Sequence, residues 1–167
     1  MTMSFRAAER SDCGLILRFI QALAEYEHLA DEVVATEDVL ERWLFDERAA
    51  EVVFALADGR DVGFALFYTN FSTFLGRPGL YLEDLFVWPE YRGCGIGRAL
   101  LGELARLAVE RGYGRFEWWC LDWNTSSIEF YRALGAQSMT EWTVYRLTGD
   151  ALARLASPDA SGDELPA

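Results

Sequence analysis

The stretch from Leu80 to Arg111 restricts the possible fold more than any other part of this chain. It opens with the apolar run LYLEDLFVW, which Pro89 ends, and it closes with an amphipathic stretch from Gly97 to Arg111. Between them, the loop RGCGIG carries three glycines at alternate positions. A short apolar run predicts a buried strand, whereas apolar residues that recur at helical spacing predict a helix. The stretch therefore predicts a strand, a tight loop and a helix in succession.

Similar patterns predict further helices and strands on both sides of that stretch. They are a strand over residues 4–8, helices that start after Asp12 and Thr36, strands over 52–57 and 62–69 joined by Asp58-Gly59, a loop over 70–79, a strand over 116–121, a helix capped by Asn124, and a last strand or hairpin over 138–147. This order describes a mixed α/β fold with one covered sheet, and we expect a single domain over residues 1–156. Residues 157–167, SPDASGDELPA, have little to bury, so we expect a disordered acidic tail.

Composition and charge exclude several classes of function. A net charge of -12 argues against a non-specific nucleic-acid binder, since such binding needs Lys and Arg to neutralise phosphates. No apolar run approaches the ~18 residues that cross a bilayer, so we expect a cytoplasmic protein without a membrane partner. The single histidine, His28, and the wide spacing of the cysteines argue against a metal site or disulfides. An acidic surface is compatible with an amine substrate, although many soluble proteins are simply acidic.

The glycine-rich loop from Arg92 to Gly97 is typical of a site that binds an anion. Its backbone N–H groups and the start of the helix can converge on phosphate oxygens, and the Arg92 guanidinium suits phosphate. A P-loop is excluded because no Gly-Lys-Ser/Thr follows. A dinucleotide fold stays open on the glycines alone, since Glu117 and Asp122 lie about 20 residues downstream, but the chain after the loop is short for a doubly wound sheet. A merely tight strand-to-helix turn is the remaining alternative.

Two acidic residues, Glu83 and Asp84, interrupt the apolar strand that precedes the loop. Burying a carboxylate is costly unless it is paired or used, so both are candidates for a functional site. Consecutive strand side chains point to opposite faces, and both acids can reach one site only if the strand splays or bulges there. Exposure at a sheet edge is the alternative, more so for Asp84 than for Glu83.

Three polar residues, Asn124, Ser127 and Tyr131, share one side of the predicted helix after the loop. A tyrosine hydroxyl, with a pKa of about 10, holds a proton at neutral pH and can give it to a departing thiolate. Asn124 can donate to a carbonyl or cap its helix. An ordinary core position is the alternative for Tyr131.

The segment from Arg92 to Gly97 resembles motif A of the GNAT superfamily of N-acetyltransferases, whose pattern is Arg/Gln-x-x-Gly-x-Gly/Ala. YLEDLFVWPEYRGCGIG, LDWNTSSIEFYRALGAQ and the Tyr26-Glu27 region resemble the diamine acetyltransferase group, and FSTFLGR before YLED is closer to its thialysine N-ε-acetyltransferase branch. The resemblance implies the GNAT fold, a mixed central sheet with helices on both faces. It also implies direct transfer of acetyl from acetyl-CoA to a small primary amine within a ternary complex, by a homodimer.

The same resemblance implies roles for individual residues. Those implied to bind acetyl-CoA are Leu85, Phe86, Val87, Arg92, Gly93, Cys94, Gly95, Ile96, Gly97, Arg98, Asn124, Ser127 and Tyr131. Tyr131 is implied as the general acid, and Glu83 as the general base acting through water. Those implied toward the amine are Tyr26, Glu27, Phe74, Glu83, Asp84 and Trp142.

The acceptor is less determined than the cofactor. Polyamine-acetylating members carry Asp where this chain has Ser72, and Trp where it has Phe74, which argues against a long polycation as substrate. Acetylation of a protein N-terminus or lysine is an alternative activity. Non-catalytic binding of an acyl-CoA is a third possibility, from a different class of protein.

Overall fold

The computed structural model describes residues 1–157, which form two compact units, residues 1–120 and the residues from 121 onward. The first unit contains strands β1 Met3–Ala7, β2 Glu51–Ala57, β3 Arg60–Ser72, β4 Arg77–Val87 and β5 Phe116–Trp118, and helices α1 Cys13–Glu27, α2 Glu37–Glu41 and α3 Ile96–Glu110. The second unit contains helices α4 Thr125–Ala133 and α5 Gly149–Ala156. Apart from Ser157, the tail expected over 157–167 lies outside the described residues.

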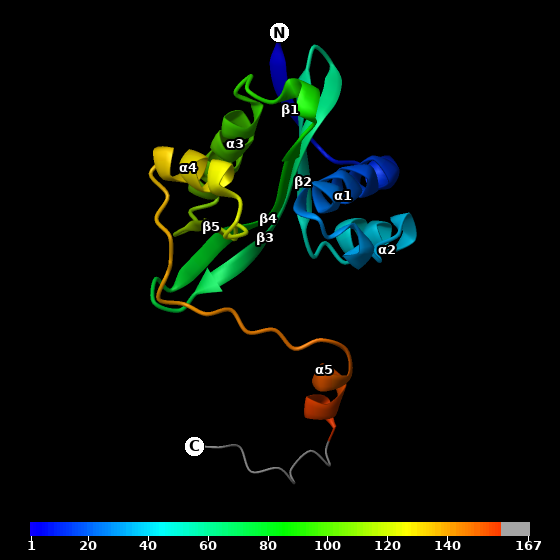
Figure 1. The fold of residues 1–167 in the computed structure, drawn as a ribbon, viewed down its shortest axis with the longest axis vertical. Coiled ribbons are helices and arrows are strands. Elements are labelled where there is room, and N and C mark those ends of the chain that lie inside the picture. The colour runs from blue at the N-terminus through cyan, green and yellow to red at the C-terminus, as the bar shows by residue number, and fades with distance from the viewer. Residues whose placement is uncertain (158–167) are drawn as a thin grey trace. The chain divides into compact units, whose positions relative to one another are not determined.

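A five-stranded sheet in the order β1-β2-β3-β4-β5 forms the centre of the first unit. Strands β1 to β4 are antiparallel neighbours, whereas β5 pairs parallel to β4. Helices α1 and α2 lie on one face of this sheet and α3 lies on the other (Figure 1). The mixed sheet with helices on both faces, which the sequence predicts, is thereby confirmed.

The face covered by α1 is packed around Phe19. This side chain is fully buried, and its ring centroid lies 4.9 Å from that of Phe64 and 4.8 Å from that of Trp88. Helical spacing turns Ile16 toward the same strands. Each large apolar side chain buried in this way contributes about 1.5–3 kcal/mol to stability. The packing fixes α1 on the sheet, so that its last residues come to lie near β4.

The other face is covered by the apolar side of α3. Its buried residues, Leu100, Leu101, Leu104 and Ala108, recur at the predicted helical spacing. Gly95 caps the helix with a left-handed backbone conformation, φ 83°, which glycine adopts without the steric penalty of a side chain. The predicted sequence of strand, glycine-rich loop and helix is therefore confirmed.

Two predicted helix starts differ in how they are capped. Thr36 caps α2 as predicted, because its Oγ1 accepts a hydrogen bond of 3.4 Å from the Val39 amide. Asp12 precedes α1, but its carboxylate binds the Arg6 guanidinium at 2.7 Å and does not cap that helix. The ion pair lowers the pKa of Asp12 and joins β1 to the start of α1.

The prediction of a loop over residues 70–79 is wrong for most of these residues. Strand β3 continues to Ser72 and β4 begins at Arg77, so that only a four-residue turn separates them. Asn70, which disfavours strands by itself, pairs with Gly79 across the hairpin, and its Nδ2 donates to Glu117 of the neighbouring β5 at 3.0 Å. Pairing within the sheet outweighs the local preference for a turn.

Two further predictions in the last third of the chain are also corrected. The strand expected over 116–121 ends at Trp118, and the residues expected to form a strand over 138–147 are exposed and form none in the described chain. Apolar content alone does not make a strand, because the backbone also needs a partner. Helix α5 lies just beyond this segment, where no element is predicted. Among residues 1–157, no helix has the length and apolar content needed to span a membrane.

Candidate active site

Strand β4 bulges at Glu83. In the pairing with β3, Leu66 faces Asp84 and Phe67 faces Leu82, which leaves Glu83 as the extra residue. Such a bulge lets two consecutive residues share one face of the sheet. As the sequence indicates, Glu83 and Asp84 can share one site only if the strand splays or bulges there, and this bulge is present. Glu83 is exposed and Asp84 is half-buried, the reverse of the order expected from the sequence.

Asp84 lies in an unfavourable environment for a negative charge. Burial, the neighbouring Glu83 and Glu27 at the end of α1 together raise its pKa to about 7. Burial also raises the pKa of Glu27. A carboxyl group with a pKa near neutral can take up and release a proton at physiological pH.

This environment predicts a pH-dependent effect of Asp84→Asn on stability. A carboxyl whose pKa is raised on folding holds its proton more tightly in the folded state, so wild-type stability falls as pH rises from about 4 to about 7. The Asn variant escapes this loss. We expect its free energy of unfolding, relative to wild type, to increase by about 2 kcal/mol between about pH 5.5 and about pH 8.5. Urea titrations at the two pH values measure the difference, and a constant difference would contradict the raised pKa.

The glycine-rich loop connects the end of β4 to α3. Gly93 and Gly95 both have positive φ, 74° and 83°, and the loop from Gly93 to Gly95 is exposed. Among the described residues, a Cβ placed on either glycine would meet no atom within 4 Å. The loop thus leaves open space in front of the first turn of α3, where unpaired backbone N–H groups favour an anion.

One edge of β4 is open next to the loop. Strand β5 pairs with β4 only at Leu80, Tyr81 and Leu82, and within residues 1–120 no strand continues that pairing. The backbone from Glu83 to Val87 therefore presents an edge to which an extended ligand can hydrogen-bond. Leu85, Phe86 and Val87, the predicted cofactor-binding residues of the strand, lie on this edge.

The side chain of Arg92 contacts residues of β4 and α1. Its Nε donates to the Val87 carbonyl at 2.9 Å, and its guanidinium carbon lies 4.9 Å from the ring centre of Tyr26 and 5.0 Å from that of Phe86. These contacts direct the side chain toward α1, whereas the loop continues toward α3 on the other face. Arg98, by contrast, is an exposed residue on the first turn of α3.

The structure brings together part of the predicted amine site. Glu27 is close enough to Asp84 to influence its pKa, and Tyr26 precedes it on α1. Tyr68 of β3, which sequence reasoning missed, also lies near this group: burial, and to a lesser degree the Glu83 carboxylate, raise the pKa of its hydroxyl. The antiparallel hairpin pattern indicates that the two strands pair, but the bulge changes the register, and this could not be predicted.

Phe74 does not join this group within the chain. It lies at the β3–β4 turn with 93% of its surface exposed. The strand rise of ~3.3 Å per residue places that turn roughly 20 Å from Glu83 along β4. Ser72, at the end of β3, is buried, and its hydroxyl accepts a hydrogen bond of 3.2 Å from the Leu75 amide. Ser72 therefore shapes the turn.

The second unit carries the remaining predicted residues. Asn124 is buried, and its Oδ1 accepts a 3.3 Å hydrogen bond from the Ser127 amide, so that it caps α4 as predicted. Tyr131 lies about two turns beyond Asn124 on this helix, half-buried, with its ring centre 5.4 Å from that of Phe130. Trp142 lies in an exposed segment without regular structure.

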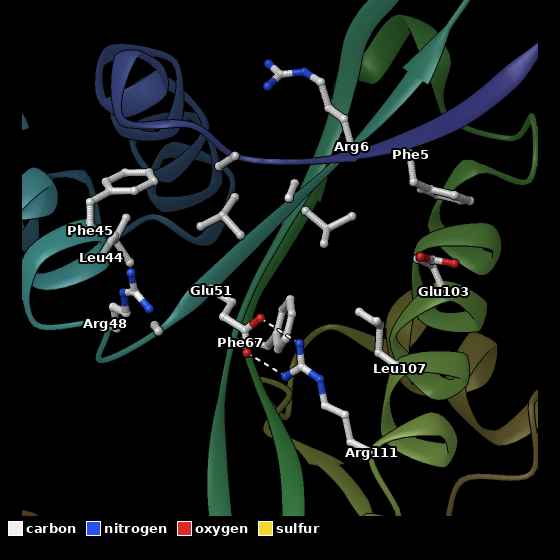
Figure 2. Close-up of a pocket in the computed structure, with 15 residues that line it drawn as sticks. Phe5, Arg6, Leu44, Phe45, Arg48, Glu51, Phe67, Glu103, Leu107 and Arg111 are labelled. Atoms are coloured by element: carbon white, nitrogen blue, oxygen red, sulfur yellow. Dashed lines mark hydrogen bonds and ion pairs between the residues drawn. The ribbon is translucent and has the colours of Figure 1, made fainter.

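A cavity of about 610 Å³ lies in another part of the first unit (Figure 2). Its walls come from β1, β2, β3, α3 and the segment after α2, and none of the predicted site residues lines it. Arg111 and Glu51 face each other across it, with Nη1–Oε1 and Nη2–Oε2 distances of 2.5 and 2.7 Å. This cavity is therefore separate from the candidate site. Within residues 1–157, no group of three or more His, Cys, Asp or Glu could hold a metal ion.

An open strand edge, a glycine-rich loop heading a helix and a bulged acidic pair occur here in one fold, and comparison with known proteins gives this arrangement a family. The model of the acetyltransferase (GNAT) family matches residues 17–136. The chain therefore belongs to the GNAT family and is an N-acetyltransferase that uses acetyl-CoA as its acyl donor.

Individual relatives show which acetyltransferases within the family this chain resembles. The thialysine N-epsilon-acetyltransferase of Bos taurus is 40% identical over 163 residues, which cover 90% of this chain and 95% of the relative. An L-ornithine N5-acetyltransferase of Arabidopsis thaliana is 49% identical over 90 residues, 54% of this chain and 40% of the relative. Among solved structures, an integron cassette protein of V. cholerae superposes with a TM-score of 0.78 at 27% identity, over 93% of this chain and 98% of that one. The GNAT fold is thereby confirmed, and the enzyme is similar to thialysine acetyltransferases.

The residues of the candidate site fit acetyl-CoA. The exposed loop from Gly93 to Gly95 suits a pyrophosphate, because glycines allow close approach to backbone N–H groups. The open edge of β4 suits the amide-containing arm of the cofactor, because the arm can pair with a strand backbone.

Proposed function

We propose that this enzyme transfers acetyl from acetyl-CoA directly to a primary amine of a small molecule. The observation that carries the proposal is the bulge at Glu83, which brings Glu83 and Asp84 to one face of β4 beside the open strand edge. An amine with a pKa near 10.4 is almost entirely protonated at pH 7, so its acetylation requires a group that removes a proton from the nitrogen.

The cofactor would be held by the residues that the family resemblance assigns to it. The β4 edge, Leu85, Phe86 and Val87, would bind the pantetheine arm, and the loop with the first turn of α3, Arg92, Gly93, Cys94, Gly95, Ile96, Gly97 and Arg98, would bind the pyrophosphate. Asn124, Ser127 and Tyr131 of the second unit would complete this site. Bound acetyl-CoA supplies the acetyl group as a reactive thioester.

Glu83 and Asp84 would remove the proton from the amine nitrogen. The family resemblance implies Glu83 as the base, acting through water, and the raised pKa of Asp84 supports a shared role for the pair. Burial, together with the charges of Glu83 and Glu27, makes the Asp84 carboxyl a proton acceptor that works near neutral pH. Tyr26 and Glu27 on α1, together with Trp142 of the second unit, would contact the rest of the amine.

Tyr131 would act as the general acid, which donates a proton to the leaving group. Its Oη, with the reference tyrosine pKa of about 10, holds a proton at neutral pH and would give it to the departing thiolate, so that coenzyme A leaves as the neutral thiol.

The acceptor class rests on the relatives and on the hairpin. The similar proteins act on thialysine and ornithine, small molecules with a primary amine. The absence of an acid at Ser72, a buried turn residue here, argues against a long polyamine. We also propose a homodimer, in which Phe74 of the exposed hairpin turn could reach a partner's amine site.

A panel of acceptors tests the proposal. The enzyme is incubated with acetyl-CoA and thialysine, lysine, ornithine, putrescine or spermidine, and thiol release is followed. We expect turnover of thialysine or ornithine to exceed that of spermidine. Unstructured peptides with a free N-terminus or lysine form the second arm. Faster turnover of peptides than of every small amine would favour a protein acetyltransferase, and no turnover in either arm would contradict the proposal.

A further inference from the structure

Arg92 stands where β4 has ended and the loop toward α3 begins, and its side chain contacts the α1 side of the sheet. Its backbone begins the loop that leads to α3, while its guanidinium lies over the rings of Tyr26 and Phe86 on the α1 side. The hydrogen bond from its Nε to the Val87 carbonyl, 2.9 Å long, fixes the plane of the guanidinium at the end of β4. The side chain therefore joins the last turn of α1, the end of β4 and the start of the loop.

The neighbours of Arg92 pack against α1 and α3 on opposite faces of the sheet. Phe86 packs in the cluster formed with α1, whereas Val87 and Leu100 of α3 approach Gly63 from the opposite face. The residues proposed to hold the amine stand at the end of α1 on one face, and those proposed to hold the cofactor begin α3 on the other. Arg92 spans this edge of the sheet.

We propose that Arg92 is a positioning residue, which holds the end of α1, and with it the acceptor side of the site, in place relative to the cofactor loop. The inference rests on the proposed function for its effect on catalysis, but its structural part does not. An arginine is suited to the task because its planar guanidinium stacks on aromatic rings while Nε donates in the plane. Lysine keeps the charge and loses both features.

Arg92 could act by positioning α1 or by supplying charge to a phosphate, and these two roles predict different effects of Arg92→Lys. If the side chain only supplied charge to the cofactor, lysine would largely replace it. As a positioning residue, Arg92 cannot be replaced by lysine, and the change should be detected in α1 even when no ligand is bound. Arg98→Lys is the matched control, since Arg98 is an exposed arginine on the first turn of α3.

Hydrogen exchange on the ligand-free protein tests the structural part. The last turn of α1 is closed by hydrogen bonds from the Leu29 and His28 amides to Ala24 and Glu25, of 2.8 and 3.2 Å. We expect Arg92→Lys to speed exchange in a peptide covering residues 24–29 by about fivefold to tenfold, the effect of losing one hydrogen bond and one stacking contact. Arg98→Lys should change it less than about twofold by the same reasoning. Unchanged exchange in Arg92→Lys would overturn the inference.

A double-mutant cycle measured by enzyme kinetics tests the catalytic part of the inference. Arg92→Lys should raise the KM for the amine about tenfold, and Tyr26→Leu, which removes the stacking ring, should reproduce a rise of the same order. In the Tyr26→Leu background, Arg92→Lys should add little, because the contact is already lost. Effects that multiply would show that the two residues act separately and would overturn the inference. If wild type turns over no amine, the proposed function fails, and the exchange experiment still decides whether Arg92 holds α1.

Discussion

Tyr131→Phe is expected to lower kcat about 10²- to 10⁴-fold, the range in which a general acid contributes. The substitution removes only the hydroxyl, and the ring that packs against Phe130 is kept. Affinity for coenzyme A, measured by titration calorimetry, should therefore stay within about threefold of wild type, since one hydrogen bond to a neutral group contributes little net affinity. Thiol release at saturating substrates measures kcat.

Tyr145→Phe provides the matched control for this variant. Tyr145 belongs to the same unit, and 91% of its surface is exposed. It should retain wild-type activity. If Tyr131→Phe also kept its rate, Tyr131 would be an ordinary packing residue, and protonation of the thiolate would fall to solvent or to another group.

Asp84→Asn and Glu83→Gln are expected to change both the rate and its pH dependence. In wild type, kcat/KM for the amine should rise with pH through a midpoint near 7, because Asp84 with a pKa of about 7 accepts a proton only when it is ionised. Asp84→Asn should abolish this limb and lower kcat/KM about 10²-fold. Glu83→Gln should keep the limb and move it to lower pH, because removal of the neighbouring negative charge lowers the pKa of Asp84.

The amine itself also loses a proton as pH rises, so the limb must be assigned with two acceptors of different amine pKa. A limb that belongs to the enzyme stays in place, and a limb that belongs to the amine moves with the acceptor. A limb that is unchanged in Asp84→Asn and shifts with the acceptor would assign the titration to the substrate. Loss of the limb in Glu83→Gln alone would return the role of base to Glu83.

Much of the fold could be predicted because its signals are local. The apolar spacing of α1 and α3, the Thr36 cap and the turn at Asp58-Gly59 each depend on residues close together in the chain. The errors fall where pairing partners lie far apart. Asn70 and Gly79 have turn-forming preferences, yet they pair within a long hairpin beside Glu117.

The residues of the candidate site also fall into two groups, those that local sequence patterns predict and those that only the fold brings together. Spacing identifies the loop from Arg92 to Gly97 and the pair Glu83 and Asp84, because glycines and acids within an apolar context are exceptional by themselves. Tyr68 was missed, since only the register between β3 and β4 brings it near Glu83.

The sequence by itself determined the order of elements, the anion-binding character of the loop and the need for a bulge if two adjacent acids were to share a site. Only the tertiary structure decided that the bulge falls at Glu83, that Asp84 is the acid whose pKa approaches 7, and that Arg92 turns toward Tyr26. The physical reason is range. Backbone preferences and helical spacing act between near neighbours in the chain, whereas burial, charge repulsion and ring stacking depend on which distant residues the fold brings together.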